Sequence, residues 1–117
     1  MRHRKTGRKF QRLSGERRAF IRNLASELIR REKIETTETR AKAIRPIVER
    51  LVSIAKKQTL ASRRLLISRL HNLKVVKKLY DELGPRYTKR PGGYLRIVKL
   101  AKSRKRDGSR LSRVEFV

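Results

Sequence analysis

Electric charge constrains the fold of this chain more than any other feature of its sequence. The 117 residues include 35 Lys and Arg against 10 Asp and Glu, a formal net charge of +25. A compact domain with that charge repels itself, and binding to a polyanion relieves the repulsion. The 37% of hydrophobic residues still suffices for one modest core. We therefore expect one small domain whose partner is a polyanion such as RNA or DNA.

Several other classes of protein fit the sequence poorly. No apolar run approaches the roughly 20 residues of a membrane-spanning helix, and no signal-peptide core follows Met1, so we expect a cytoplasmic location and no membrane partner. The absence of Cys excludes disulfides and Cys-based zinc sites. The two histidines, His3 and His71, make no acid–base pair with each other or with Asp81-Glu82. We expect no enzyme activity, no metal, no cofactor and no small-molecule substrate.

The first 13 residues form a basic segment. No acid precedes Glu16, no helical apolar stripe is present, and Gly7 interrupts the segment. This predicts an extended arm over residues 1–13 and a single domain over 14–117. The alternative is a solvated charged tail. The arm residues predicted to contact RNA are Arg2, His3, Arg4, Lys5, Arg8, Lys9 and Arg12.

Apolar residues then repeat at helical spacing. The first predicted helix starts at Ser14, as its N-cap, and runs to about Glu32. Its polar face presents Arg18 and Arg22, which we predict to bind RNA. A second helix starts at Thr37. Its stripe stays in phase across an interior proline, which predicts one kinked helix rather than two.

Two further helices precede a strong stop signal. The third is predicted to start at Thr59 and the fourth at Asn72, with Leu60 and Leu73 among the inward-facing residues. We expect Gly84 to adopt the left-handed conformation that ends the fourth helix, because the proline after it cannot continue a helix.

Three segments have the character of strands. Lys33–Thr37 is short and β-branched, and segments Tyr94–Lys102 and Leu111–Val117 flank a turn signal at residues 106–109. Because a two-stranded hairpin is marginal alone, the first segment is expected to add a third strand. The prediction is an α+β, two-layer domain of order α-β-α-α-α-β-β, with helices on one face of a small sheet that ends in a C-terminal hairpin.

Two basic projections are predicted within the domain. One is the loop 85–96, whose predicted RNA-binding residues are Arg86, Tyr87, Lys89, Arg90, Tyr94 and Arg96. The tyrosines either stack on unpaired bases or pack on the core. The other is the hairpin tip 102–110, with Lys102, Arg104, Lys105 and Arg106; the alternative there is a mobile turn.

The long stretch between Glu49 and Asp81 contains no acid. Its helices carry several basic residues that either bind RNA or are simply solvated, and the sequence does not choose between these. They include Arg63, Arg64, Arg69, Lys74, Lys77 and Lys78.

Four ordered segments carry a resemblance to a known family. They read MRHRKTGRKFQR, GERRAFIRNLASELI, IETTETRAKAIRP and YDELGPRYTKRPGGYLRIVKL. Together they resemble the bacterial large-subunit ribosomal protein 17 family over most of the chain. The opening and the ELGPRY…R…GGYLRI pattern are the most specific parts.

The resemblance implies a structural protein of the large (50S) subunit that binds 23S rRNA near the peptide exit tunnel. It also implies neighbouring large-subunit proteins, with proteins 32 and 22 as candidates. Two other classes are weighed against it. An architectural DNA-binding protein would need one contiguous basic surface with groove-reading side chains. An RNA-processing enzyme would need a His or carboxylate constellation that the sequence lacks.

Overall fold

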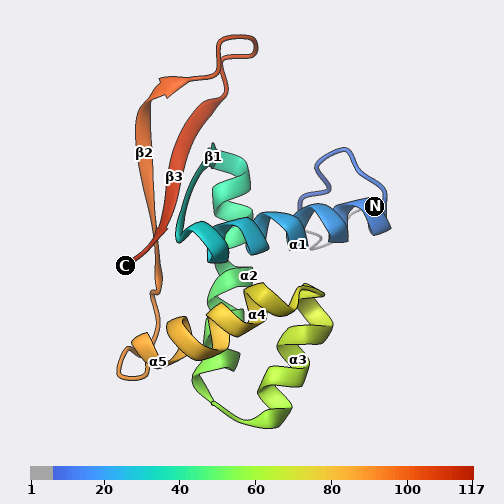
Figure 1. The fold of residues 1–117 in the computed structure, drawn as a ribbon. Helices are drawn as coiled ribbons and strands as arrows, with labels where there is room; N and C mark the ends of the chain where they lie inside the picture. The colour runs from blue at the N-terminus through green and yellow to red at the C-terminus, as the bar shows by residue number, and fades with distance from the viewer. Residues whose placement is uncertain (1–6) are drawn as a thin grey trace.

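The computed structural model describes residues 7–117, and Figure 1 shows the arrangement of their elements. The elements are α1 (Ser14–Arg31), β1 (Lys33–Thr37), α2 (Glu38–Lys56), α3 (Leu60–Leu70), α4 (Leu73–Lys78), the π-helical turn η1 (Leu79–Leu83), α5 (Gly84–Arg86), β2 (Leu95–Ser103) and β3 (Arg110–Phe116). The predicted order is confirmed, because α4, η1 and α5 form one uninterrupted helical run.

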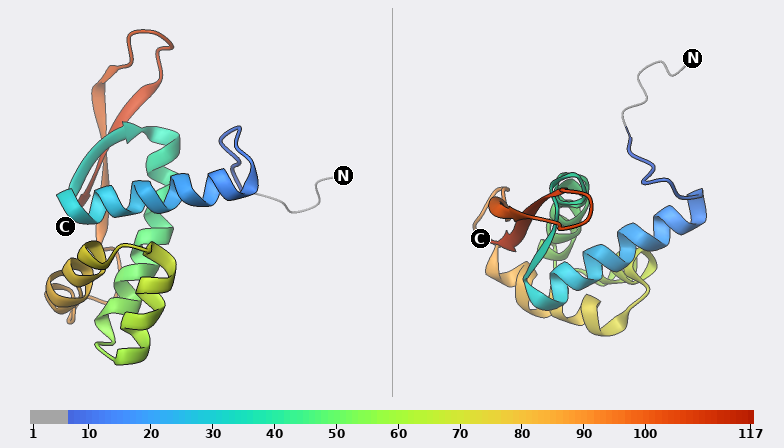
Figure 2. Two further views of the ribbon diagram at one scale, coloured as in Figure 1. Left: turned by 45° about the vertical axis from the view of Figure 1, so that its right-hand side comes forward. Right: turned by 90° about the horizontal axis from the view of Figure 1, so that it is seen from above.

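The sheet has three antiparallel strands in the order β1-β3-β2. Val114 on the central strand pairs with Ile34 on one side and Ile97 on the other, so one register aligns the apolar face of all three strands. Beyond Lys99 the register of the hairpin shifts. The hairpin then extends past the body of the domain, as Figures 1 and 2 show.

Helix α2 is the central element. It contacts all three strands on one side and α1, α3, η1 and α5 on the others. Its buried stripe includes Ile44, Val48 and Val52, which are fully inaccessible. Pro46 lies inside this single helix, so the prediction of one helix rather than two is confirmed. Burial of such a side chain stabilises the fold by about 1.5–3 kcal/mol.

The predicted N-caps are confirmed at three of four helices, and the remaining helix, α1, begins at Ser14 as predicted but is not capped by it. The Thr37 hydroxyl accepts a hydrogen bond from the Arg40 N–H, Thr59 forms a reciprocal capping box with Ser62, and the Asn72 side chain accepts two backbone N–H groups. The prediction of Ser14 as the N-cap is wrong. Leu13 occupies the N-cap position of α1 and supplies no side-chain cap.

Two residues predicted to face inward do not. Leu60 is 62% exposed and Leu73 is 67% exposed. Each is the first residue of its helix, so its side chain precedes the turn that packs on the core. Val75 takes the buried position in α4 instead.

The predicted helix stop at Gly84 is also wrong. Gly84 has φ −55° and ψ −56°, which is helical, and α5 continues through the following proline to Arg86. Gly84 is needed for close packing rather than for a left-handed turn. A Cβ there would lie 2.9 Å from the Ala55 carbonyl oxygen on α2.

The arm is not extended where it joins α1. Phe10 and Gln11 have φ of 52° and 53° and form a turn. The Phe10 ring packs on Phe20 with a centroid distance of 5.4 Å, and Arg12 Nη1 donates to the Phe10 carbonyl. The Arg12 guanidinium also lies 4.0 Å from the centroid of the Phe20 ring. These contacts fix residues 10–12 against the domain.

Candidate nucleic-acid interface

Carboxylates neutralise a defined subset of the basic residues. Each of seven acids lies within 4 Å of at least one Lys or Arg nitrogen, and residues 1–6 contain no acid. The cations in these pairs are Arg30, Arg31, Lys42, Arg45, Arg86, Arg96, Lys99, Lys102, Arg104 and Arg113. A cation held by its own carboxylate is a weaker phosphate ligand, because the acid must first be displaced. The remaining cations are therefore the ones available to an anionic partner.

Most basic side chains of the loop 85–96 are held by contacts within the protein. Arg86 pairs with Glu32 at 2.7 Å, and Arg96 lies 3.6 Å from Glu115. Arg90 Nε donates to the carbonyl oxygens of Gly92 and Gly93, both at 3.2 Å. These contacts hold the loop against the domain, so it does not form an open phosphate-binding surface. Only Lys89 among its predicted RNA ligands remains exposed with no partner in the described chain.

The tyrosines of this loop belong to the core. Tyr87 is 4% exposed and Tyr94 is 2% exposed, and their ring centroids lie 5.3 Å apart. The Tyr87 hydroxyl donates to the Val117 carbonyl at 2.7 Å. Buried rings offer no face to a base, so stacking on RNA by these two residues is wrong and the alternative of core packing holds.

A lysine fixes the Tyr94 hydroxyl in place. Lys56 Nζ donates to this oxygen at 2.9 Å, and the ammonium lies 5.1 Å from the ring centroid. Burial pushes the pKa of Tyr94 upward, but the hydrogen bonds from Lys56 and Ser53 outweigh that effect and lower the pKa below 10.0. Lys56 thus serves the core rather than RNA.

The hairpin tip is partly neutralised in the same way. Lys102 pairs with Glu35 of β1 at 2.8 Å, and Arg104 Nε lies 3.2 Å from the Asp107 carboxylate. Lys105 and Arg106 are exposed, and neither has an acid partner in the described part of the chain. The tip therefore presents two adjacent cations on a turn that Arg104 and Asp107 hold in shape.

The tip is expected to lose this shape in acid. The Ser109 N–H and then Arg104 lower the pKa of Asp107 from 3.8 to about 2. Because the folded-state pKa is depressed, the contribution of Asp107 to turn stability is full above pH 3.8 and is lost as the pH falls towards 2. An NMR titration of the Gly108 and Ser109 amides should show a transition in that window. The Asp107→Asn variant should abolish it, and a transition that persists in this variant would assign it to another group.

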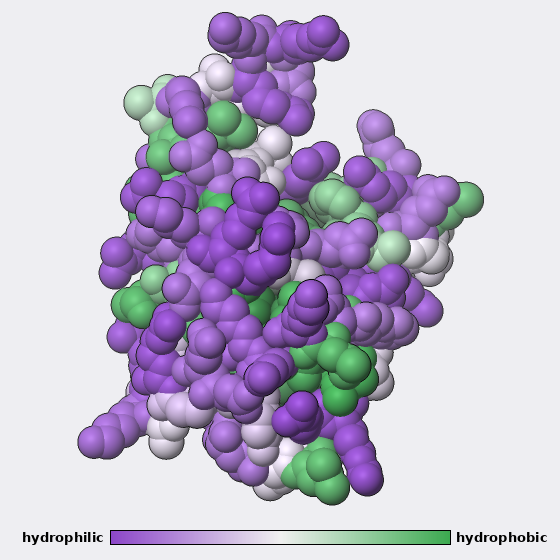
Figure 3. Space-filling view, in the orientation of Figure 1, coloured by the Kyte–Doolittle hydropathy of each residue, from purple (hydrophilic) through white to green (hydrophobic). Residues whose placement is uncertain are grey.

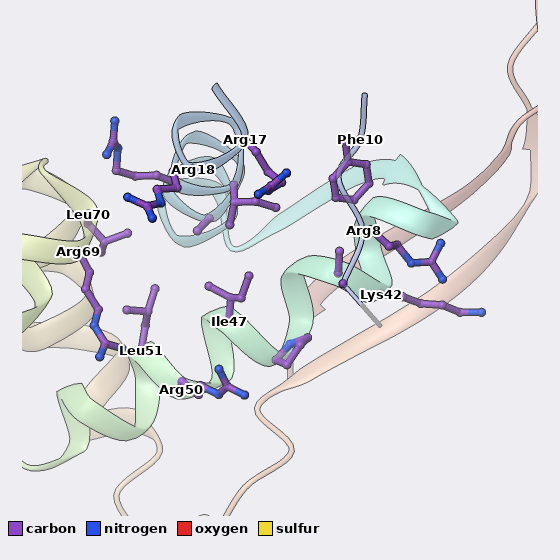
Figure 4. Close-up of a pocket in the computed structure, with 16 residues that line it drawn as sticks. Arg8, Phe10, Arg17, Arg18, Lys42, Ile47, Arg50, Leu51, Arg69 and Leu70 are labelled. Carbon is purple, nitrogen blue, oxygen red and sulfur yellow. The ribbon is translucent and has the colours of Figure 1, made fainter. Parts of the chain in front are cut away.

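Among the described residues, six unpaired arginines line a groove between α1, α2 and the end of α3. Figure 4 shows Arg17 and Arg18 of α1 on one side, Arg50 of α2 and Arg69 on the other, and Arg8 at the end nearest the arm. Arg22 completes the set. No acid lines the groove, and these six arginines make no ion pair within residues 7–117. Lys42 also lines it but is held by Glu38 at 2.9 Å.

The floor of this arginine groove is apolar. Its hollow measures about 650 Å³. The residues beneath the arginines are Phe10, Ile21, Ala25, Ala43, Pro46, Ile47, Leu51 and Leu70. Ala25, Leu51 and Leu70 belong to the buried core, so the floor rests on rigid packing. An acid-free ring of arginines around an apolar floor is suited to a nucleic acid, with phosphates on the rim.

Comparisons with known proteins identify the family of this chain. The sequence profile described as "Ribosomal protein L17" matches residues 20–117. A curated protein of Gemmatimonas aurantiaca, described as "Large ribosomal subunit protein bL17", is 47% identical over 117 residues, which cover 100% of this chain and 98% of the relative. The chain belongs to the ribosomal protein L17 family.

Within this L17 chain, the predicted RNA ligands fall into distinct groups. Arg2, His3, Arg4 and Lys5 lie outside the described residues. Arg8, Arg18 and Arg22 converge on the arginine groove, whereas Lys9 is exposed beside it and Arg12 packs on Phe20. RNA contact by these residues stays a prediction. The loop and the tip hold most of the others in intramolecular contacts.

Three groove residues were not among the predicted ligands. The sequence does not predict Arg17 and Arg50 as ligands, and it does not choose between RNA and solvent for Arg69. The sequence contains a signal that distinguishes all three from the paired arginines. None has an acid three or four positions away, whereas Arg30, Arg31 and Arg45 have one and are paired.

In the part of the chain that the structure describes, no three His, Cys, Asp or Glu residues gather where a metal ion could bind. None of its helices has the length and apolar character needed to cross a bilayer. Figure 3 shows hydrophobic residues only as small patches on a largely hydrophilic face.

Proposed function

We propose that this protein is a structural component of the large ribosomal subunit in the cytoplasm, where it binds and stabilises 23S rRNA through phosphate-backbone contacts. The observation that carries the proposal is the arginine groove: six arginines without carboxylate partners surround one acid-free hollow beside the basic arm. Membership of a ribosomal protein family supports rRNA as the kind of RNA. The 47% identical relative is named as a large-subunit protein, which supports the same subunit here.

A location near the peptide exit tunnel, with proteins 32 and 22 of the large subunit as neighbours, is part of the proposal. It rests on the resemblance of the arm and of the ELGPRY…GGYLRI segment to the large-subunit protein 17 family. Crosslinking in assembled ribosomes, followed by mass spectrometry, tests it. We expect crosslinks from the hairpin tip or the arm to tunnel-exit rRNA, and crosslinks confined to the opposite side of the subunit would contradict this location.

Cofractionation tests the function itself. The tagged protein should sediment with the large subunit at low salt and leave it only at high salt, because phosphate contacts weaken as salt rises. The alternative is an architectural DNA-binding protein. If the protein sedimented with chromosomal DNA, or stayed at the top of the gradient, the proposal would be wrong.

Deleting residues 1–9 should weaken rRNA binding without unfolding the domain. The deletion removes Arg2, Arg4, Lys5, Arg8 and Lys9 but keeps the Phe10–Phe20 contact. Each lost phosphate contact lowers the slope of log K against log salt by roughly 0.7–0.9. Filter binding over a salt series measures this slope, and circular dichroism checks the helices. An unchanged slope would show that the arm does not touch phosphate.

A further inference from the structure

Phosphate binding by the arginines does not explain why the floor of the arginine groove is apolar. A paired RNA helix presents phosphates and sugar hydroxyls on its outside, and neither covers an apolar surface favourably. Yet Ala43, Pro46 and Ile47 form an open, partly exposed floor between the arginines. A ligand that matches this groove must carry negative charge at its edges and an apolar face in its middle.

An unpaired nucleotide has this combination. Its phosphates are anionic, and the flat face of its base is stacked by aromatic and other planar or apolar groups in single-strand sites. The hollow of about 650 Å³ has room for a base, and its lining includes the small residues Ala25 of α1 and Ala43 of α2. The other features of the groove are consistent with such a ligand.

Pro46 removes one backbone hydrogen-bond donor from α2 beside the groove. A proline has no N–H, so the Lys42 carbonyl lacks the donor that the residue four positions later normally supplies in a helix. Lys42 and Pro46 both line the hollow. A base amino group or a ribose 2′-hydroxyl is a donor that can satisfy this carbonyl. The same proline ring offers a flat apolar surface beside it.

The arginines indicate a nucleotide inside a chain rather than a free one. Arg8 lies at the end of the groove nearest the arm and Arg69 at the end nearest α3, with Arg18 and Arg50 between them (Figure 4). Cations at both ends fit a strand with a phosphate on each side of the bound base. A free mononucleotide has phosphate on one side only and would leave one end unpaired.

We propose that the groove binds an unpaired, extruded nucleotide of RNA, with its base on the floor of Ala43, Pro46 and Ile47 and its flanking phosphates on the arginines. This inference rests on the proposed function and makes it more specific. It turns a general phosphate-binding surface into a site that selects a bulged or looped strand over a continuous duplex.

The test compares two RNA hairpins that differ only in one bulged adenine, and the probe is the full-length protein. The wild-type protein should bind the bulged hairpin on the order of tenfold more tightly than the paired one, the scale of stacking one base. A bulged 2-aminopurine in place of the adenine should change its fluorescence on binding. Equal affinity for both hairpins would overturn the inference while leaving phosphate binding intact, whereas no binding to either would overturn the proposed function as well.

Two variants and a matched control test whether the hollow causes the preference for the bulged hairpin. Ala43→Leu fills the hollow without changing charge, so it should lower affinity for the bulged hairpin on the order of tenfold and abolish its preference over the paired one. Ala61→Leu, the same change at an exposed position on α3 that lines no groove, should behave as wild type. Pro46→Ala restores the missing N–H to the helix and should also reduce the preference while raising thermal stability. A preference that survives in the folded variants would overturn the inference.

A competition experiment distinguishes a nucleotide within an RNA chain from a free nucleotide as the ligand of the groove. Adenosine monophosphate at millimolar concentration should not displace the bulged hairpin, because it cannot reach the arginines at both ends. Displacement at micromolar concentration would assign the groove to a free nucleotide and contradict the RNA assignment.

Discussion

Replacing Arg18, Arg22 and Arg50 together by glutamine should lower the affinity for 23S rRNA at least about 100-fold at 0.1 M salt. The three side chains line the groove and have no carboxylate partner among residues 7–117, so their charges are available to phosphate. Hydrogen bonds to charged groups contribute about 1.5–3 kcal/mol each. The slope of log K against log salt should fall by about 2–3, roughly one per lost phosphate contact. A filter-binding salt series measures both quantities.

A control triple with the same change in net charge makes this test decisive. Arg30, Arg31 and Arg45 are also helical surface arginines, but each is held by Glu27 or Glu49. Their replacement by glutamine should lower affinity less than about threefold, because exposed pairs contribute little and long-range charge is screened. Equal losses in the two triples would show that binding follows total charge and that the groove has no special role.

The contrast between these triples could be read from the sequence in part. On a helix, residues three and four apart are neighbours, so an acid at that spacing can form an ion pair with an arginine. Arg45 has Glu49 four positions later, whereas Arg50 has Pro46, Ile47, Ser53 and Ile54 at the same spacings. The rule predicts which arginines are unpaired. It does not predict that those of α1, α2 and α3 converge, because convergence depends on how the helices pack.

The two tyrosines of the loop 85–96 show a different limit of prediction from the sequence. A Pro- and Gly-rich basic loop with two tyrosines fits base stacking and core packing equally well. The Tyr87 hydroxyl donates to the Val117 carbonyl, and the Tyr94 hydroxyl accepts from Lys56 on α2. Both partners are distant in sequence, so the hydrogen bonds that decide the matter exist only in the folded chain.

The prediction of a helix end at Gly84-Pro85 is wrong for a related reason. Local rules assign glycine before proline to a helix end, and tertiary packing overrides that preference here. The Gly84 N–H donates to the Leu79 carbonyl, five residues back, which makes the π-helical turn η1. The Tyr80 carbonyl accepts instead from Gln58 Nε2 at 2.8 Å, and the same nitrogen donates to Ala55 at 2.8 Å. Gln58 thereby joins the end of α2 to η1.

This junction leads to a second large effect, a loss of stability in the Gly84→Ala variant. The new Cβ would lie 2.9 Å from both the Ala55 carbonyl oxygen and Gln58 Nε2. The carbonyl belongs to the backbone of α2 and cannot rotate away, so α5 or the end of α2 must shift. Overpacking of this kind costs about 1–3 kcal/mol in the free energy of unfolding. Urea unfolding followed by circular dichroism measures it.

The control is the same substitution at Gly15 in the first turn of α1. A Cβ there meets no atom within 4 Å. Alanine is a better helix former than glycine, so Gly15→Ala should be neutral or should stabilise the protein by up to about 1 kcal/mol. Both glycines are helical and the chemical change is identical, so only the space around Gly84 separates the variants. If Gly84→Ala were as stable as Gly15→Ala, the close approach of α5 to α2 would not be a constraint on this fold, and glycine at position 84 would need another explanation.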